Sequence, residues 1–346
     1  MIMAPPDSKM QDLTAMGCQC ISIPMVGKGT NIFREFWLFA KYLYYLTSVK
    51  PDVYISFTIK PVLYGGLAAR FLGVPTIVTI TGLGTVFIRE TFLTRLVERI
   101  YRYSLLKAER VLFQNQADRT EFVTRNLVNV EQTERVPGSG IDIRRFYYQP
   151  PRLRSVEEGM VFLMVARILK DKGIFEFVNA ATRIKKMHPA TRFVLAGSAD
   201  SDNQTAVSIG QVELWHDIGV IEYVGFVENI IRLVGDADCV VLPSYREGLS
   251  RSLLEALAVG RPIVTTSVPG CADLVEDRVS GFICAPRNVD DLVMKIEQFI
   301  ELNMQERENM GLAGRLRAER EFAEGIVLQQ YSQIVDRIVK KTTQAR

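Results

Sequence analysis

The chain of 346 residues has few of the side chains that bind metals or form covalent cross-links. It contains five cysteines and two histidines, His188 and His216. The cysteine count is odd, the cysteines are scattered, and the single residue between Cys18 and Cys20 is not a metal-ligand spacing. We therefore predict no structural zinc site, and a reducing compartment rather than a disulfide-bonded secreted domain. Both histidines are interpreted as helix-associated surface residues rather than catalytic groups.

The chain also lacks a large excess of charge of either sign. Its formal net charge is +3, which is too small to indicate a nucleic-acid partner. The distribution is uneven, because residues 1–140 carry 16 Lys and Arg against 11 Asp and Glu. A mildly basic first half is compatible with an anionic surface or substrate.

Neither a signal peptide nor an unbroken membrane span is evident. Residues 1–6 have no basic region and no long apolar core. The uncharged stretch 71–88 has the length of a span, but Gly73, Pro75, Gly82 and Gly84 interrupt it. We expect a buried strand at 76–80 followed by a glycine loop. With 48% hydrophobic and 23% charged residues, the chain has the composition of a globular protein, and its length favours about two domains.

The most informative stretch runs from residue 237 to 266. An apolar run at 237–243 predicts a buried strand, and 262–266 predicts another. Between them, the leucines of residues 249–259 recur at helical spacing, and Gly248 lies just before the expected helix. The pattern is that of a βαβ unit with a glycine at the turn from strand to helix.

The chemistry of this turn suits a phosphorylated ligand. Amides at a helix N-terminus attract anions, and Gly248 allows close approach to the backbone. Glu247 and Glu255 are eight residues apart, or about 12 Å if the segment is helical throughout. Two carboxylates with anion-binding amides between them would suit a nucleotide diphosphate sugar. An ordinary surface helix with a solvated glutamate at each end fits the same spacing.

The rest of the chain alternates strands and helices in two series, which predicts parallel sheets with helices on both faces. The expected fold class is α/β, with two Rossmann-like, doubly wound domains that face a cleft. Glycine and proline between 137 and 151 mark the boundary. We predict a first domain at 1–140, a second at 141–320, and a C-terminal helical segment, 321–346, that crosses back to the first.

A second loop supports the same ligand class. Arg167, Lys170, Lys172 and Gly173 follow an expected strand at 160–166 and precede an expected helix. Cations beside a helix N-terminus could clamp a diphosphate, although a solvated basic loop would have the same composition.

Together these motifs resemble the retaining nucleotide-sugar glycosyltransferases of the GT-B fold, glycosyltransferase family four. The matching segments are PGSGID (137–142), VARILKDKG (165–173), GFV (225–227), PSYREG (243–248), EA (255–256), GRP (260–262) and PG (269–270). GSADSDN (197–203) and FTIKP (57–61) are similar to the branch that builds bacterial surface polysaccharides, such as capsule and lipopolysaccharide, and lipid-linked oligosaccharides. The resemblance covers nearly the whole chain and is strongest from 137 to 290.

The resemblance implies three catalytic residues. Arg167 and Lys172 would bind and neutralise the diphosphate, and Glu247 would contact the donor sugar. The reaction would move a hexose or N-acetylhexosamine from a UDP-sugar to an acceptor with retention of anomeric configuration. No cofactor or metal is expected beside the UDP-sugar substrate.

The resemblance also implies donor-binding residues. Glu255 would hold the ribose, and the amides of Gly248 and Leu249 would meet the phosphates or the sugar. Gly173 and Ser198, in the loops that follow two strands, would complete the donor site.

The acceptor implied by the resemblance is a lipid-linked sugar or a growing polysaccharide, and the implied location is cytoplasmic, with peripheral contact at the inner face of the plasma membrane. The aromatic helix expected at 33–49 and the basic helix expected at 91–107 could lie on an anionic membrane. Alternatively, their aromatics pack in the core and their cations are solvated. Lys60 is a candidate for an acceptor phosphate, or caps a loop.

Three features leave other functions open. Relatives start with a strand and a glycine-rich loop, and we expect this chain to begin after them. The first domain is therefore expected to be truncated, and an inactive remnant that binds nucleotide or a partner is one alternative. A UDP-sugar 2-epimerase is a second, disfavoured because both histidines lie in helical stretches. Asp200 and Asp202 form a D-x-D pattern, which we interpret as a turn rather than a metal site.

Overall fold

A computed structural model describes residues 1–7, 9–25, 32–83, 92–155, 158–199, 203 and 205–344. The chain divides into two compact units. Unit 1 contains residues 1–113, 119–134 and 333–346, and unit 2 contains residues 114–118 and 135–332. The last helix, α12 (Glu324–Gln344), therefore begins in unit 2 and ends in unit 1.

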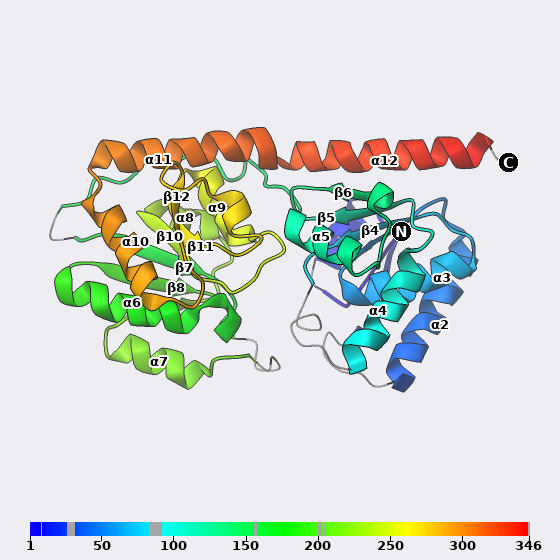
Figure 1. The fold of residues 1–346 in the computed structure, drawn as a ribbon, viewed down its shortest axis with the longest axis horizontal. Helices are drawn as coiled ribbons and strands as arrows, with labels where there is room; N and C mark the ends of the chain where they lie inside the picture. The colour runs from blue at the N-terminus through cyan, green and yellow to red at the C-terminus, as the bar shows by residue number, and fades with distance from the viewer. Residues whose placement is uncertain are drawn as a thin grey trace. The chain divides into compact units, whose positions relative to one another are not determined.

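Unit 2 is built on one parallel sheet of six strands in the order β12-β11-β10-β7-β8-β9 (Figure 1). Its strands are β7 (Val161–Val165), β8 (Arg192–Ala196), β9 (Glu222–Gly225), β10 (Cys239–Leu242), β11 (Ile263–Thr266) and β12 (Gly281–Cys284). Its helices are α6 (Ile174–Met187), α7 (Ile209–Asp217), α8 (Ile230–Asp236), α9 (Arg251–Val259), α10 (Val289–Glu301) and α11 (Met304–Arg317). Helix α6 packs beside α10 and α8 packs beside α9, so helices cover both faces of the sheet.

The strand order reverses direction between β7 and β10. From β7 the chain adds β8 and β9 on one side, and then returns to place β10 on the other. Strands β7 and β10 are apolar runs whose residues are almost all buried, as expected for central strands covered on both faces. Ligands of open parallel sheets bind at such a reversal, beyond the carboxyl ends of the strands.

Aromatic packing fills the core of unit 2. Phe162 of β7 is fully buried and stacks on Phe193 of β8 with ring centroids 5.1 Å apart. Phe299 of α10 and Phe177 of α6 meet this pair edge-on at 6.0 and 5.5 Å. The apolar periodicity of the two helices and the two strands therefore converges on one cluster.

Helix α9 differs from the prediction at its start. It begins at Arg251 rather than at Leu249, because the Ser250 hydroxyl caps it by accepting a hydrogen bond from the Leu253 amide. It ends at Gly260, which has the left-handed conformation (φ 83°) that favours glycine. Residues 247–250 are consequently a loop, and the assumption of continuous helix from Glu247 to Glu255 was wrong.

Unit 1 contains two smaller sheets. Strands β1 (Ile2–Ala4) and β2 (Cys20–Ser22) form one parallel pair. The other sheet has the order β3-β4-β5-β6, with β3 (Tyr54–Phe57), β4 (Thr76–Ile80), β5 (Arg110–Phe113) and β6 (Thr133–Arg135). The helices of unit 1 are α1 (Met10–Ala15), α2 (Ile32–Val49), α3 (Gly66–Phe71) and α4 (Phe92–Leu105). Helix α5 (Gln116–Thr124) begins in unit 2 and ends in unit 1. The absence of a first strand from this domain stays a prediction.

Strands β3 to β5 pair in parallel, and so does every pair in the unit 2 sheet, which confirms the α/β class with parallel sheets. The stretch 71–88 contains the buried strand β4, as predicted, whereas Gly84 and the residues after it lie outside the described ranges. Within the described part of the chain, every helix is too short or too polar to cross a bilayer.

The aromatic cluster predicts a strong effect of Phe162→Ala. Removing a buried ring should lower the free energy of unfolding by about 3–5 kcal/mol, since the cavity cannot collapse fully. Urea denaturation of the full chain measures this. The matched control is Phe226→Ala, where the side chain is 75% exposed and the expected loss is below about 0.5 kcal/mol. Equal losses in the two variants would contradict this core assignment.

Candidate active site

The carboxyl ends of β7 and β10 open into a cavity of about 410 Å³ that lies entirely in unit 2. The loop after β7 contributes Arg167 and Lys172, and the loop after β10 contributes Glu247. Ser198 follows β8, and Glu255 lies on α9. Five of the eight predicted site residues therefore line one cavity at the reversal of strand order.

Gly173 positions the loop after β7 without lining the cavity. Its backbone is left-handed (φ 78°) at the N-terminus of α6, and a β-carbon there would lie 2.1 Å from the Pro243 carbonyl oxygen. Glycine at this position lets the β7–α6 loop pack directly against the end of β10. Two hydrogen bonds also join the loops. The Tyr245 amide (2.8 Å) and the Ser244 hydroxyl (3.1 Å) both donate to the Asp171 carbonyl.

An ion pair connects these two loops across the cavity. The Lys172 ammonium lies 2.5 Å from Glu247 Oε1, and the two side chains are only 16% and 14% exposed. A pair so sheltered from water is stronger than a surface pair, and removing one partner leaves the other uncompensated. The sequence placed both residues in the site but did not predict that they pair.

Glu176 and Arg287, which the sequence analysis missed, both contact Tyr245 in the loop that carries Glu247. The Tyr245 hydroxyl donates a 2.6 Å hydrogen bond to Glu176 on α6, and the Arg287 guanidinium lies 4.5 Å from the centre of the Tyr245 ring. Burial and the neighbouring Glu176 carboxylate raise the pKa of Tyr245, so it stays a neutral donor. These contacts fix the loop that carries Glu247.

Backbone bonds hold residues 247–250 on their other side. The Glu247 amide donates to the Pro269 carbonyl (3.2 Å), and the Ser250 amide donates to the Gly270 carbonyl (3.0 Å). Within the described chain, the amides of Gly248 and Leu249 donate to no other group. Gly248 and Leu249 do not line the cavity, although they adjoin residues that do.

A buried polar network belonging to unit 2 anchors the same loop. The Asn115 side-chain amide donates to the Gly248 carbonyl (2.7 Å) and to Asp118 (3.0 Å). Asp118 is 1% exposed and also receives a 2.6 Å bond from Arg246. The sequence analysis missed Asn115, Asp118 and Arg246, because the only local signal was a pair of polar residues after an apolar strand.

Glu255 lines the cavity from α9. Its side chain is 13% exposed and lies 3.1 Å from Arg251, one helical turn earlier. Arg251 also donates to the Ser139 hydroxyl at 3.2 Å. Burial raises the pKa of the Glu255 carboxyl, and the Arg251 guanidinium opposes part of this shift.

Among the described residues, the others that the sequence analysis considered for function do not line this cavity. His216 accepts a hydrogen bond from the Tyr223 amide (3.2 Å), and neither His216 nor His188 lines this cavity. Lys60 forms a half-buried ion pair with Glu35 (2.5 Å). Asp200 and Asp202 lie outside the described residues. Among the residues that are described, no group of three or more His, Cys, Asp or Glu could hold a metal ion.

Comparison with known proteins identifies two family models along the chain. Residues 149–317 match the model of glycosyl transferases group 1, and residues 1–115 match the glycosyl transferase 4-like model. The two matched ranges together cover more than four-fifths of the chain.

Two curated relatives are similar over almost the full length. One is the N,N'-diacetylbacillosaminyl-diphospho-undecaprenol alpha-1,3-N-acetylgalactosaminyltransferase of Campylobacter jejuni, which is 29% identical over 98% of this chain and 91% of the relative. The other is the capsular polysaccharide biosynthesis glycosyltransferase CapM of Staphylococcus aureus, which is 26% identical over 92% and 85%.

Solved structures show the fold. The chain superposes on Anabaena HepE in complex with UDP with a TM-score of 0.78, at 19% identity and over 96% of this chain and 91% of that one. A glycosyltransferase from Rickettsia africae gives a TM-score of 0.77 at 17% identity, over 98% and 89%. These likenesses confirm the GT-B fold.

The buried Glu255 carboxyl predicts a pH-dependent stability. Because its pKa is raised in the folded chain, its contribution to stability is present below the unfolded pKa and is lost as the pH rises through the folded pKa. The Glu255→Gln variant cannot ionise. Between about pH 4 and about pH 7, its free energy of unfolding should therefore rise relative to that of the unaltered chain. Urea denaturation at the two pH values measures this difference.

Glu222 provides a control of opposite sign. Its hydrogen bond with Arg192 lowers the pKa of the Glu222 carboxyl, so its stabilising contribution is present above the unfolded pKa and is lost as the pH falls. Glu222→Gln should therefore lose stability relative to the unaltered chain over the same rise in pH. The account of Glu255 is contradicted if both variants change in the same direction.

Proposed function

Since the chain belongs to the GT-B glycosyltransferases of family four, we propose that it transfers a hexose or N-acetylhexosamine from a UDP-sugar with retention of anomeric configuration. The observation that carries this proposal is the cavity at the strand reversal of unit 2, where Arg167 and Lys172 face the same space as Glu247 and Glu255. Cations suit a diphosphate, and carboxylates suit the hydroxyls of ribose and sugar. The UDP and UDP-glucose complexes of HepE support the choice of nucleotide.

Each lining residue has a role in this proposal. Arg167 and Lys172 bind the diphosphate, and Glu255 accepts hydrogen bonds from the ribose hydroxyls. Glu247 uses Oε1 to hold Lys172, which leaves Oε2 for a hydroxyl of the donor sugar. Ser198, after β8, offers a hydroxyl to the phosphates.

Two glycines and a backbone amide complete the donor site. The amides of Gly248 and Leu249 are available for a phosphate or sugar oxygen, because the Gly248 carbonyl and the neighbouring amides are already held in place. Gly173 keeps the diphosphate-binding loop against Pro243.

The reaction breaks the bond between the anomeric carbon and the diphosphate oxygen and forms a bond from that carbon to an acceptor oxygen. Negative charge grows on the departing diphosphate, and Arg167 and Lys172 stabilise it where it develops. The leaving phosphate oxygen takes the proton of the acceptor hydroxyl on the same face of the sugar, which retains the configuration. The ion pair with Glu247 holds the Lys172 charge in place before substrate binds, and the hydrogen bond from Tyr245 to Glu176 holds the loop that carries Glu247.

The acceptor in this proposal is a lipid-linked sugar or a growing polysaccharide. The Campylobacter relative is named for an undecaprenol-linked acceptor and CapM for capsular polysaccharide biosynthesis, and both are similar to this chain over most of their length. The proposal places the enzyme in the cytoplasm, at the membrane face where such acceptors are presented.

Exposed aromatic side chains on α2 support contact with that membrane. Phe33, Phe36 and Trp37 are 85%, 69% and 47% exposed on adjacent turns, and the Lys41 ammonium lies 3.9 Å from the centre of the Trp37 ring. On α4, Arg95 and Arg99 are exposed, whereas Arg102 donates to the Arg125 and Asn126 carbonyls. Lys60, which follows β3, pairs with Glu35 of α2. We propose that α2 inserts its aromatic side chains at the bilayer interface.

Removing either clamp cation should reduce activity strongly. Arg167→Ala and Lys172→Ala should each lower kcat/KM by about 10²- to 10³-fold, because each removes charge stabilisation of the leaving diphosphate. The measurement is UDP release from a panel of UDP-hexoses in the presence of a lipid-linked acceptor. The matched control is Lys170→Ala, an exposed lysine of the same loop outside the cavity, with an expected loss below about fivefold.

The same assay distinguishes the alternative of an inactive remnant. UDP binding without sugar transfer from any donor of the panel would favour a chain that binds nucleotide without turnover. Equal losses in Lys170→Ala and Lys172→Ala would contradict the assignment of the diphosphate clamp.

Loss of an aromatic anchor should weaken membrane binding. Phe36→Ser should reduce the affinity for phosphatidylglycerol vesicles by at least about tenfold, since one buried aromatic ring contributes about 1.5–3 kcal/mol. Vesicle co-sedimentation measures the partition coefficient. Phe226→Ser, an equally exposed phenylalanine of unit 2, serves as the control and should have no effect. Identical partitioning of both variants would argue against α2 as the contact.

A further inference from the structure

A second cavity of about 370 Å³ lies at the opposite ends of the same strands. Its walls include Met160, just before β7, and Asp238, just before β10. The segment 151–155, the turn 260–262 after α9, and the first residues of α11 close it. All of these residues belong to unit 2, and none of them lines the cavity assigned to the donor.

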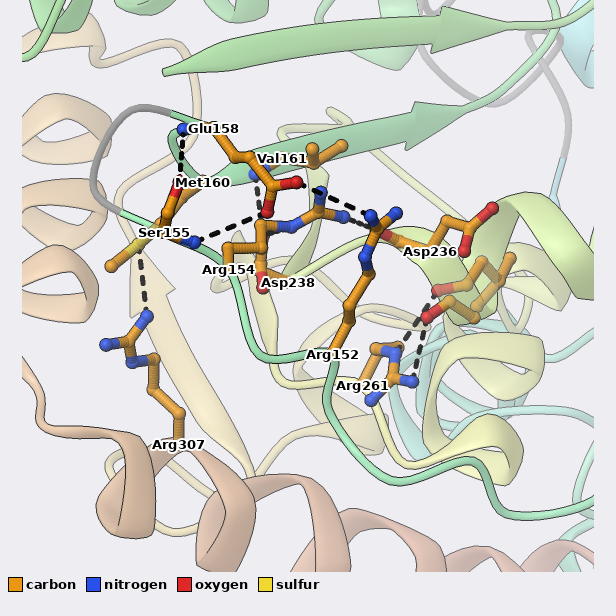
Figure 2. Close-up of polar contacts among 12 residues, drawn as sticks. Arg152, Arg154, Ser155, Glu158, Met160, Val161, Asp236, Asp238, Arg261 and Arg307 are labelled. Atoms are coloured by element: carbon orange, nitrogen blue, oxygen red, sulfur yellow. Dashed lines mark hydrogen bonds and ion pairs between the residues drawn. The ribbon is translucent and has the colours of Figure 1, made fainter. Parts of the chain in front are cut away.

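Four arginines line this second cavity, and one of them is fully used by the fold (Figure 2). Arg154 lies 2.8 Å from Asp238 and also donates to the Asp236 carbonyl, with both charged side chains about 10% exposed. Asp238 in turn accepts a 2.7 Å bond from the Val161 amide. This pair therefore fastens the loop before β7 to the start of β10.

A second arginine has only a loose partner. Arg152 lies 3.5 Å from Glu158, and the two side chains are 55% and 46% exposed. Exposed pairs of this length contribute little, so Arg152 can turn toward another anion at small cost.

The other two arginines have no carboxylate partner among the residues that the structure describes. Arg261 is 1% exposed and donates only to backbone carbonyls, those of Val234, Gly235, Pro150 and Gly260. Arg307 rises from α11 toward Met160, where its nearest contact is the thioether sulfur at 3.4 Å (Figure 2). Its other hydrogen bond within the described chain is a long one (3.5 Å) to the carbonyl of Asn303, the N-cap residue of α11. Sulfur is a weak acceptor, so the Arg307 charge is poorly compensated.

Most of the remaining wall is apolar, and Ser155, His188, Thr191 and Asp238 add polar groups to it. Leu153, Met160, Pro262, Ile300 and Met304 contribute hydrocarbon and thioether surface beside the uncompensated cations. A cavity of this size, mostly apolar with a few polar groups, has the character of a small-molecule site. A cation without a close carboxylate partner, next to apolar surface, favours a ligand that brings both a negative charge and an apolar body.

We propose that this cavity is a binding site for a small organic anion, in which Arg307 and Arg152 bind the carboxylate or phosphate group and the apolar wall holds the body. Arg261, which also lines the cavity, adds buried positive charge. The turn that carries Arg261 joins the C-terminal end of α9 to β11, and α9 carries Glu255 at the donor cavity. A ligand here would thus contact an element shared with the donor site.

The test uses the full chain and a pair of fluorescent probes of similar shape. 8-Anilinonaphthalene-1-sulfonate carries an anionic group, whereas N-phenyl-1-naphthylamine is neutral. Titrations are run in saturating UDP, so that binding at the donor cavity does not contribute. Arg307→Gln should weaken sulfonate binding by about tenfold, the effect of losing one charge-assisted hydrogen bond, and should change binding of the neutral probe by less than about twofold.

Two further variants control the measurement. Arg152→Gln should weaken sulfonate binding in the same direction, and Arg320→Gln, a 73% exposed arginine of α11's continuation, should leave it unchanged. Arg307 makes no ion pair in the described chain, so its variant should fold, which its thermal unfolding temperature verifies. Unchanged sulfonate affinity in Arg307→Gln and Arg152→Gln, or a parallel fall for the neutral probe, would overturn the proposal.

Discussion

The ion pair between Lys172 and Glu247 is the interaction on which the candidate site depends. It joins the loop after β7 to the loop after β10. Because both side chains are only about 15% exposed, water cannot fully solvate one charge if the other is removed. The pair forms only because the strand order places β7 beside β10 and because Gly173 lets the first loop lie against Pro243. The strand order, the left-handed glycine and the ion pair together preorganise the Lys172 ammonium in the candidate site.

The two ends of the central strands have different electrostatics. At the carboxyl ends, Lys172 and Arg251 each have a carboxylate partner that holds the cation in place in the candidate donor cavity. At the amino ends, Arg261 and Arg307 have no such partner within the described chain, and the surrounding wall is mostly apolar. The first arrangement suits a substrate that presents both phosphates and hydroxyls, and the second suits a ligand that itself supplies the missing negative charge.

Much of this arrangement could be predicted from the sequence, because it depends on local patterns. Apolar runs located the strands, and polar residues directly after them located Arg167, Lys172 and Glu247 at one edge of the sheet. The start of α9 was misplaced, since Leu249 continues the helical spacing while Ser250 caps the helix. The pairing of Lys172 with Glu247, and the anchoring of Gly248 by Asn115, join residues far apart in sequence, and no local pattern encodes such contacts.

Calorimetric titration of the unaltered chain with UDP and with uridine tests the central claim most directly. If Arg167 and Lys172 form a diphosphate clamp, UDP should bind at least about a hundredfold more tightly than uridine, the effect of two charge-assisted hydrogen bonds. Replacing Lys172 by methionine should reduce that ratio by about tenfold while leaving uridine binding unchanged. Equal affinities for UDP and uridine, or a ratio unaffected by Lys172→Met, would contradict the account.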